Sequence, residues 1–238
     1  MLNKQFLVMY RLDKYKESDS MSFLIGDNYR ILLVMSRFGI GLGLGDKTID
    51  AVCRENGVDT KTFLVIVNML LDEDGLVDYS QAEVSIETLL FYLHNSHDYF
   101  LDFRLPAIRK DLVEILNAQP GELSQAVIHC FDEYVSEVRK HMMYEEETVF
   151  PYVRALLRGE KDKRYNIGIF RTQHDQVESR LHEFKNILIK YYPAKSTNEL
   201  NRLLFDIFNC EDDLASHNAI EDRLFVPVIT ERELMLTK

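Results

Sequence analysis

Histidine and glutamate stand in this chain at positions where a helical repeat of apolar residues leads us to expect leucine or valine. His141 and Glu145 lie one helical turn apart in the apolar stripe of residues 128–152. Residues four apart project from the same face of a helix, so this imidazole and this carboxylate can reach one point. A buried carboxylate is costly unless a partner compensates it, and the partner that we expect here is a bound cation.

The same pattern recurs near the end of the chain. HNAIEDRLFVP, residues 217–227, repeats the order of HMMYEEETVFP, residues 141–151: histidine, three residues, glutamate, a second acid, and phenylalanine shortly before proline. One HxxxE pair occurs often by chance on surface helices, whereas two inward-facing copies on separate helices are a more specific signal. His217 and Glu221 are therefore expected to face the same point as the first pair. Other acids, Glu146, Glu147 and Asp222, fall off the stripes and are interpreted as solvated or outer residues.

Two further predicted helices supply one histidine each. His174 lies in the apolar stripe of residues 169–191, and LHNSHD offers His94 and His97 in an earlier helix. Both of these fit the stripe of that helix, and spacing alone does not choose between them. For any single histidine, a hydrogen-bonded core residue is the commoner explanation. For the whole set, chance alone would have to place six histidine and glutamate residues at inward positions of four helices.

The expected donors are imidazole nitrogens and carboxylate oxygens without a thiolate, a set typical of iron, manganese or zinc. Four histidines and two glutamates exceed the ligands of one tetrahedral zinc ion. If both glutamates bridge, two metals share the set, and positions remain for an oxo or hydroxo bridge and a small added ligand. We therefore expect two iron ions, with manganese or zinc less favoured.

Helices must position these ligands, because the apolar periodicity is helical throughout the second part of the chain. Short breaks separate the helical patterns, and short connections between long helices favour antiparallel neighbours. The expected fold class is therefore all-α, with an antiparallel up-down four-helix bundle over residues 83–234. Its helices are expected at residues 84–116, 123–157, 166–192 and 197–231.

A small helical N-terminal domain is expected before the bundle, over residues 21–72, after a polar lead-in of residues 1–20. The glycine-rich stretch 39–45 lacks the order of residues and the preceding strand of a phosphate-binding loop, so a turn between helices is the better interpretation. The helices of this domain are predicted at residues 28–38, 49–55 and 60–71.

Composition excludes several classes of protein. Asp and Glu number 39 against 28 Lys and Arg, for a formal net charge of -11, and no basic patch with interleaved aromatic residues indicates a nucleic-acid partner. No apolar run is long enough to span a bilayer, so no membrane partner is expected, and the first residues are not typical of a signal peptide. The scattered Cys53, Cys130 and Cys210 form no disulfide framework and fit a reducing cytoplasm, where we expect the protein.

These segments together resemble the hemerythrin-like di-iron proteins, and within them the repair-of-iron-centres family of iron–sulfur cluster repair proteins. The two HxxxE segments resemble that family's paired motifs, TQHDQ its isolated-histidine helix, and LHNSHDYFLDFRLP its first-helix motif. In the first-helix motif the family's ligand is the first histidine, which implies His94 with His97 as a neighbour. The resemblance thus implies two irons bridged by the two glutamates. The implied ligands are His94, His141, Glu145, His174, His217 and Glu221.

The N-terminal region resembles the family's small helical domain, with one departure. NYRILLVMSRFGI and KTIDAVCRENGVD match the pattern on either side of that domain's cysteine pair, but Gly43 and Leu44 stand in place of the pair. Cys53 is displaced by about three helical turns and is not a substitute for it. Steps that need a dithiol, such as electron delivery, are therefore not carried over to this chain.

The resemblance implies a non-haem di-iron protein that protects or repairs iron–sulfur centres damaged by nitrosative or oxidative stress. Iron donation or reductive handling of nitric oxide would be the chemistry, with damaged iron–sulfur proteins and a reductant as partners. The alternative is a module that binds or senses O₂ or NO, or stores iron, without catalytic turnover. The sequence leaves open whether the chain is an enzyme and whether it forms a homodimer.

Overall fold

The computed structural model describes residues 14–72, 78–79, 82–117, 121–160, 164–171, 177–193 and 197–236. Within these ranges all regular elements are helices, and the only extended pairing is an isolated bridge between Ser20 and Thr48. The all-α fold class is therefore confirmed. None of the described helices is both long and apolar enough to cross a membrane.

The chain divides into two compact units. One comprises residues 1–96 and 220–228, and the other comprises residues 97–219 and 229–238. The domain boundaries expected at residues 72 and 83 stay a prediction.

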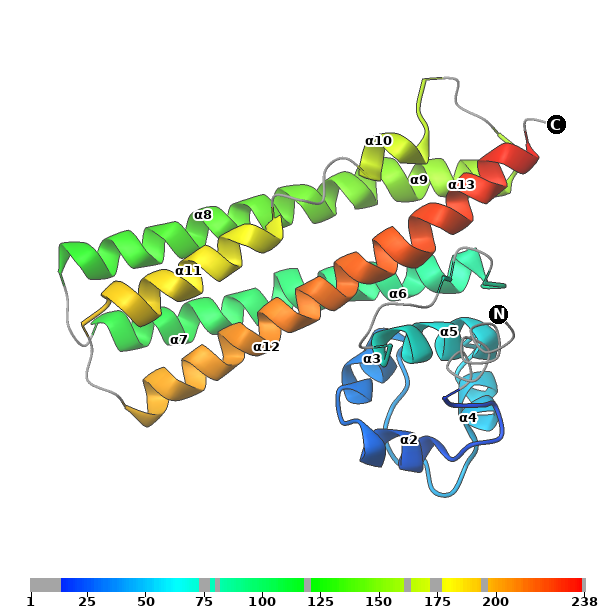
Figure 1. The fold of residues 1–238 in the computed structure, drawn as a ribbon, viewed down its shortest axis with the longest axis horizontal. Coiled ribbons are helices and arrows are strands. Elements are labelled where there is room, and N and C mark those ends of the chain that lie inside the picture. Colours follow the sequence, from blue (N-terminus) through cyan, green and yellow to red (C-terminus); the bar gives the residue numbers. More distant parts are fainter. Residues whose placement is uncertain are drawn as a thin grey trace, which may run out of the picture. The chain divides into compact units, whose positions relative to one another are not determined.

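The first unit begins with short helices, and N-cap residues mark where three of them start. The side chains of Ser20, Thr48 and Asp59 each accept a backbone N–H from the first turn of the helix that follows, and such caps satisfy donors that a helix leaves unpaired. These helices are α2 (Met21–Asp27), α3 (Ile31–Arg37), α4 (Ile49–Glu55) and α5 (Thr60–Leu70), coloured blue to cyan in Figure 1. Helix α2 is missing from the predicted set, because its seven residues bury only Met21 and Leu24 and show no clear period.

Helix α6 (Ile86–Asp98) packs against the short helices of this unit. The ring of Phe38 lies 5.5 Å from that of Phe63 and 4.9 Å from that of Tyr92, measured between centroids. The buried Arg37 donates from Nη1 to the Tyr92 hydroxyl at 3.3 Å, and Asn95 Nδ2 donates to the Arg37 carbonyl at 2.6 Å. Aromatic packing and hydrogen bonds therefore fix α6 just before the histidine at position 97.

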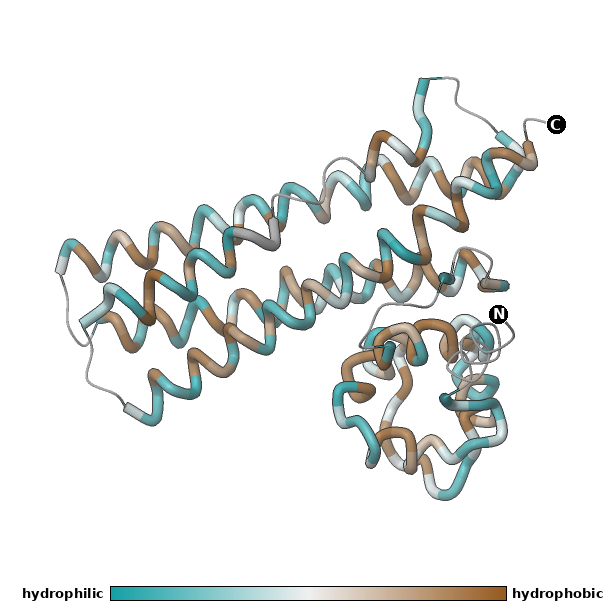
Figure 2. Tube along the Cα trace, in the orientation of Figure 1, coloured by the Kyte–Doolittle hydropathy of each residue, from teal (hydrophilic) through white to brown (hydrophobic). Residues whose placement is uncertain are grey.

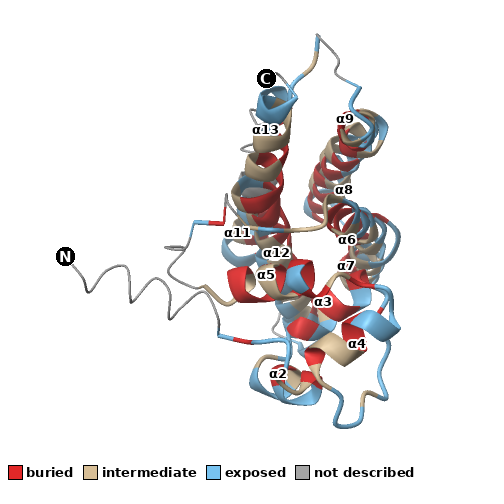
Figure 3. Cartoon of the chain, turned by 90° about the vertical axis from the view of Figure 1, so that its right-hand side faces the viewer, coloured by how far each residue is buried: buried red, intermediate tan, exposed pale blue. Residues whose placement is uncertain are grey.

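The second unit contains the bundle. Figure 1 shows its successive long helices running in opposite directions, as the short connections predict. Apolar stretches alternate with polar ones along each helix in Figure 2, and buried residues recur between exposed ones in Figure 3, as expected of amphipathic helices. One core joins α7 (Leu105–Asn117), α8 (Glu122–Tyr144), α11 (Val177–Tyr191) and α12 (Asn198–Ile220) through side chains such as Leu112, Phe131, Phe184 and Ile207.

The long helices continue beyond this core. Helix α6 leads through η1 (Tyr99–Arg104) into α7, α8 through η2 (Glu145–Val149) into α9 (Phe150–Leu157), and α12 through η4 (Glu221–Phe225) into α13 (Val226–Met235). The segment expected as one helix over residues 166–192 contains α10 (Ile167–Arg171) and α11, and residues 172–176 between them lie outside the described part.

The elements η1, η2 and η4 are π-helical turns, and each is followed within two residues by a proline. The last N–H before each proline bonds the carbonyl five residues earlier: Leu105 to Phe100, Phe150 to Glu145, and Val226 to Glu221. Proline has no N–H for the carbonyl four residues back, and its ring clashes with that carbonyl in a regular α-helix. A wider turn accommodates the proline without breaking the helix. The prolines are Pro106, Pro151 and Pro227.

The bundle core gives a first test of the fold. Phe131 is fully buried, with its ring centroid 5.2 Å from that of Phe184, so Phe131→Ala should leave a cavity. We expect the free energy of unfolding of the metal-free protein to fall by about 3–5 kcal/mol, as measured by urea denaturation. Phe205→Ala is the matched control, because that side chain is 69% exposed. Equal losses in the two variants would contradict the placement of Phe131 in the core.

Candidate metal centre

Four ligand-type side chains converge in the interior. His97, Glu145, His217 and Glu221 each offer one ligand atom, and these atoms all lie within 4.8 Å of one another. Both carboxylates are fully buried, and the two imidazoles are nearly so. Such a set is unusual in a helical core, where ionisable side chains are rarely buried without partners.

The helices place these residues by simple rules. His217 and Glu221 are one turn apart on the continuous helix formed by α12 and η4, and His141 and Glu145 are in the same relation on α8 and η2. Each glutamate is the first residue of a π-helical turn, and its carbonyl accepts the bond that closes that turn. Wide turns of this kind occur frequently at functional sites.

Glu145 lies between two imidazoles. His141 Nε2 is 2.8 Å from Glu145 Oε1, and His97 Nε2 is 3.0 Å from Glu145 Oε2. Each carboxylate oxygen thus faces a different histidine. A carboxylate in this position can hold positive charge at both of its oxygens.

Aromatic rings form the walls around the histidines. The ring of His97 stacks on Phe150 at 5.5 Å between centroids and meets the ring of His217 edge-on at 5.2 Å. The ring of Phe100 meets His217 at 5.8 Å, and Phe170 stacks beside His141 at 6.3 Å. These rings limit the access of water, which strengthens electrostatic interactions inside the site.

The site favours positive charge. Burial lowers the pKa of His97, but the charge of Glu145 and the hydrogen bonds to Glu145 and Glu146 outweigh burial and raise that pKa to about 9. The imidazolium form is therefore stabilised in the metal-free chain. A metal cation next to the same carboxylates would be stabilised by the same charges.

The residues fit a metal centre of nitrogen and oxygen donors. Two fully buried carboxylates with ligand atoms within 4.8 Å of each other repel unless positive charge lies between them. The imidazole and carboxylate donors match the preferences of iron, manganese and zinc, and the cluster contains no thiolate. A metal cation of this class therefore offsets the repulsion between the two carboxylates more effectively than protonation of the cluster alone.

The structure brings together some of the predicted ligands. Glu145, His217 and Glu221 belong to the cluster, and His141 lies against Glu145. The predicted ligand His174 lies outside the described residues, so its position stays a prediction.

The two histidines of the first predicted helix lie differently in the structure. The side chain of His94, the ligand that the family resemblance implied, is exposed and lies outside the cluster. His97, the alternative that spacing left open, belongs to the cluster and is 2% exposed. Which of the two histidines binds a metal stays a prediction. Residues three apart on a helix differ by about 60° in direction, enough to turn one of them outward.

Glu146 contacts the site from outside the cluster, which agrees with the second of its two interpretations. Glu146, interpreted from its position as a solvated or outer acid, bonds His97 Nδ1 at 2.7 Å. Glu147, the next residue in the chain, is exposed, and so is Asp222, as expected of solvated acids. The apolar repeat does not identify His97 as its partner, because Glu146 lies outside the stripe and His97 is on another helix.

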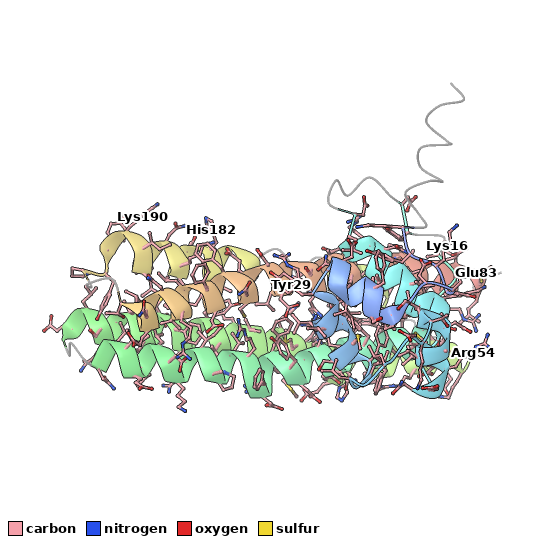
Figure 4. The ribbon with its side chains drawn as sticks, turned by 90° about the horizontal axis from the view of Figure 1, so that it is seen from below. Lys16, Tyr29, Arg54, Glu83, His182 and Lys190 are labelled. Atoms are coloured by element: carbon pink, nitrogen blue, oxygen red, sulfur yellow. The ribbon has the colours of Figure 1, made fainter. Side chains whose placement is uncertain are left out.

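Two other histidines, His129 and His182, lie away from the centre. Their side chains are 75% and 61% exposed and pair with Glu133 and Glu211. Figure 4 shows His182 on the outer side of α11. They are surface residues of the bundle.

Comparison with known proteins agrees with this geometry. Residues 88–229 match the family model described as the hemerythrin HHE cation-binding domain, a span that contains the whole cluster and more than half of the chain. A comparison with curated proteins finds no match.

Proposed function

Because the chain belongs to the hemerythrin HHE cation-binding family, we propose that its cluster holds two iron ions at a carboxylate-bridged centre. We further propose that this centre protects or repairs iron–sulfur centres damaged by nitrosative or oxidative stress. Its small ligands would be O₂ and NO. Its macromolecular partners would be damaged iron–sulfur proteins and a source of electrons in the cytoplasm.

The proposed ligand set follows the cluster. His97, His141 and His217 would supply imidazole nitrogens, and Glu145 and Glu221 would supply carboxylate oxygens, each to both metals. His174 is proposed as a further nitrogen donor. Bound iron would supply redox chemistry and coordination positions for a diatomic ligand.

The position of Glu145 carries this proposal. It is fully buried, and its two oxygens face two different histidines at 2.8 and 3.0 Å. A carboxylate flanked in this way could contact one metal through each oxygen, with a different histidine beside each metal. The aromatic walls formed by Phe150 and Phe100 would keep bulk water from the bound ligand.

A second function is favoured by the glycine-rich loop of the first unit. Gly43 stands where the resembling family has a cysteine, and its φ of 90° is a left-handed conformation that residues with a Cβ rarely adopt. This loop is therefore built for glycine and not for a cysteine at that position. A module that binds O₂ or NO without dithiol-dependent turnover is the corresponding alternative.

Reactivity with NO separates the two functions. Iron-loaded, chemically reduced protein should consume NO repeatedly in the presence of an electron donor, and should restore activity to an iron–sulfur enzyme that NO has inactivated. The metal-free protein is the control. Reversible uptake of O₂ or NO, limited to the number of centres and without recovery of the damaged enzyme, would contradict repair and support the binding module.

A further inference from the structure

Two carboxylates hold the ring of His97 from opposite sides. Glu145 Oε2 lies 3.0 Å from Nε2, and Glu146 Oε1 lies 2.7 Å from Nδ1. The two glutamates are consecutive in η2, yet they reach different nitrogens of one imidazole. The ring itself is 2% exposed, and the Glu146 side chain is 21% exposed.

This arrangement determines which nitrogen faces the cluster. A carboxylate is an acceptor, so Nδ1 must carry the hydrogen that it donates to Glu146. Nε2 then faces Glu145, where it carries the second proton of the imidazolium in the metal-free chain. A cation that displaced this proton would bind to the Nε2 lone pair. Stacking on Phe150, with only 6° between the ring planes, opposes rotation of the imidazole out of this orientation.

The charge of Glu146 adds to its position. An imidazole that donates to a carboxylate is a stronger base at its other nitrogen than one that donates to a neutral group, so it binds a metal more tightly. Glu146 is not itself a member of the cluster. Its hydrogen bond to His97 is therefore a direct route by which it can act on a metal in the cluster.

We propose that Glu146 is the positioning residue of the centre: it fixes the orientation and tautomer of His97 and increases the donor strength of Nε2. This inference rests on the proposed function, because a cation bound by His97 is what the orientation serves. The inference adds to the proposed centre a residue that binds no metal itself. The negative charge of Glu146 makes the His97 side of the centre more electron-rich.

The test uses the full chain with Glu146→Ala, Glu146→Gln and, as a matched control, Glu147→Ala on the exposed neighbouring residue. Ferrous iron is titrated anaerobically against a chelator, and the reduction potential of the loaded centre is measured. Glu146→Ala should weaken iron binding about 10- to 100-fold. Glu146→Gln keeps a carbonyl acceptor, so it should recover most of the affinity, with a more positive potential because one negative charge is lost. Glu147→Ala should match the wild type in both measurements.

The outcomes distinguish this inference from the proposed function. Wild-type affinity and potential in Glu146→Ala would overturn the positioning role while leaving the iron centre intact. Absence of iron binding by the wild-type chain would instead overturn the proposed function. In that case, ¹⁵N resonances of the His97 ring in the metal-free chain still decide the role of Glu146. They should shift in Glu146→Ala and not in Glu147→Ala, and an unshifted ring in both would overturn it.

Discussion

Replacement of Glu145 or Glu221 by alanine is expected to remove one or both irons from the chain, because each carboxylate is proposed to contact both metals. Both side chains are fully buried, and their ligand atoms belong to one cluster. Loss of a bridging group removes a donor from each metal and exposes the remaining charges to mutual repulsion. Iron per chain, measured after anaerobic reconstitution and gel filtration, should fall from two in the wild type to one or none.

The controls for these variants come from the same turns. Glu147→Ala and Asp222→Ala remove exposed carboxylates next to the proposed ligands and should leave the iron content unchanged. Circular dichroism of each metal-free variant checks that the helices are retained. Wild-type iron content in both Glu145→Ala and Glu221→Ala would refute the bridging assignment.

His97→Ala should lose iron, whereas His94→Ala should keep it. His97 faces Glu145 at 3.0 Å inside the cluster, and the His94 side chain is exposed. The loss of one imidazole removes a metal ligand and also leaves the buried charge of Glu145 with one fewer histidine contact. Iron content and the optical spectrum of the two variants, prepared in parallel, provide the measurement.

The two histidine variants also control for each other. They remove the same chemical group from the same helix, three residues apart, so a general effect on helix stability would appear in both. Retention of iron by His97→Ala together with its loss in His94→Ala would show that the first histidine is the ligand, as the family resemblance implied.

The fold was predictable where apolar periodicity is long. The helical patterns around Phe131 and Ile207 run for many turns, and both segments form helices with a shared core. Helix α2 shows the opposite case, because two buried residues in seven give too short a repeat. Its Ser20 cap satisfies a backbone donor of the first turn but adds nothing to the apolar repeat.

The pairing of the candidate ligands was predictable for a related reason. His141 and Glu145, and likewise His217 and Glu221, share a helix, so a fixed spacing determines that they face together. The choice between His94 and His97 depends on the direction in which the helix faces, which spacing within one helix does not contain. The contact of Glu146 with His97 joins two helices and requires their packing.

The π-helical turns could not be predicted from the apolar periodicity of the sequence. Pro151 and Pro227 lie inside segments predicted as continuous helices, and the helices do continue past them. The chain accommodates each proline with a bond from the preceding residue to a carbonyl five positions back. Hydrophobic periodicity cannot register one such bond, because a single wide turn changes the repeat too little.

The number and identity of the bound metals test the centre most directly. Protein purified without chelators or added metal should contain two irons per chain, with the charge-transfer absorption of an oxo-bridged diferric pair. One zinc ion per chain, or no metal after reconstitution with iron, would contradict the di-iron centre.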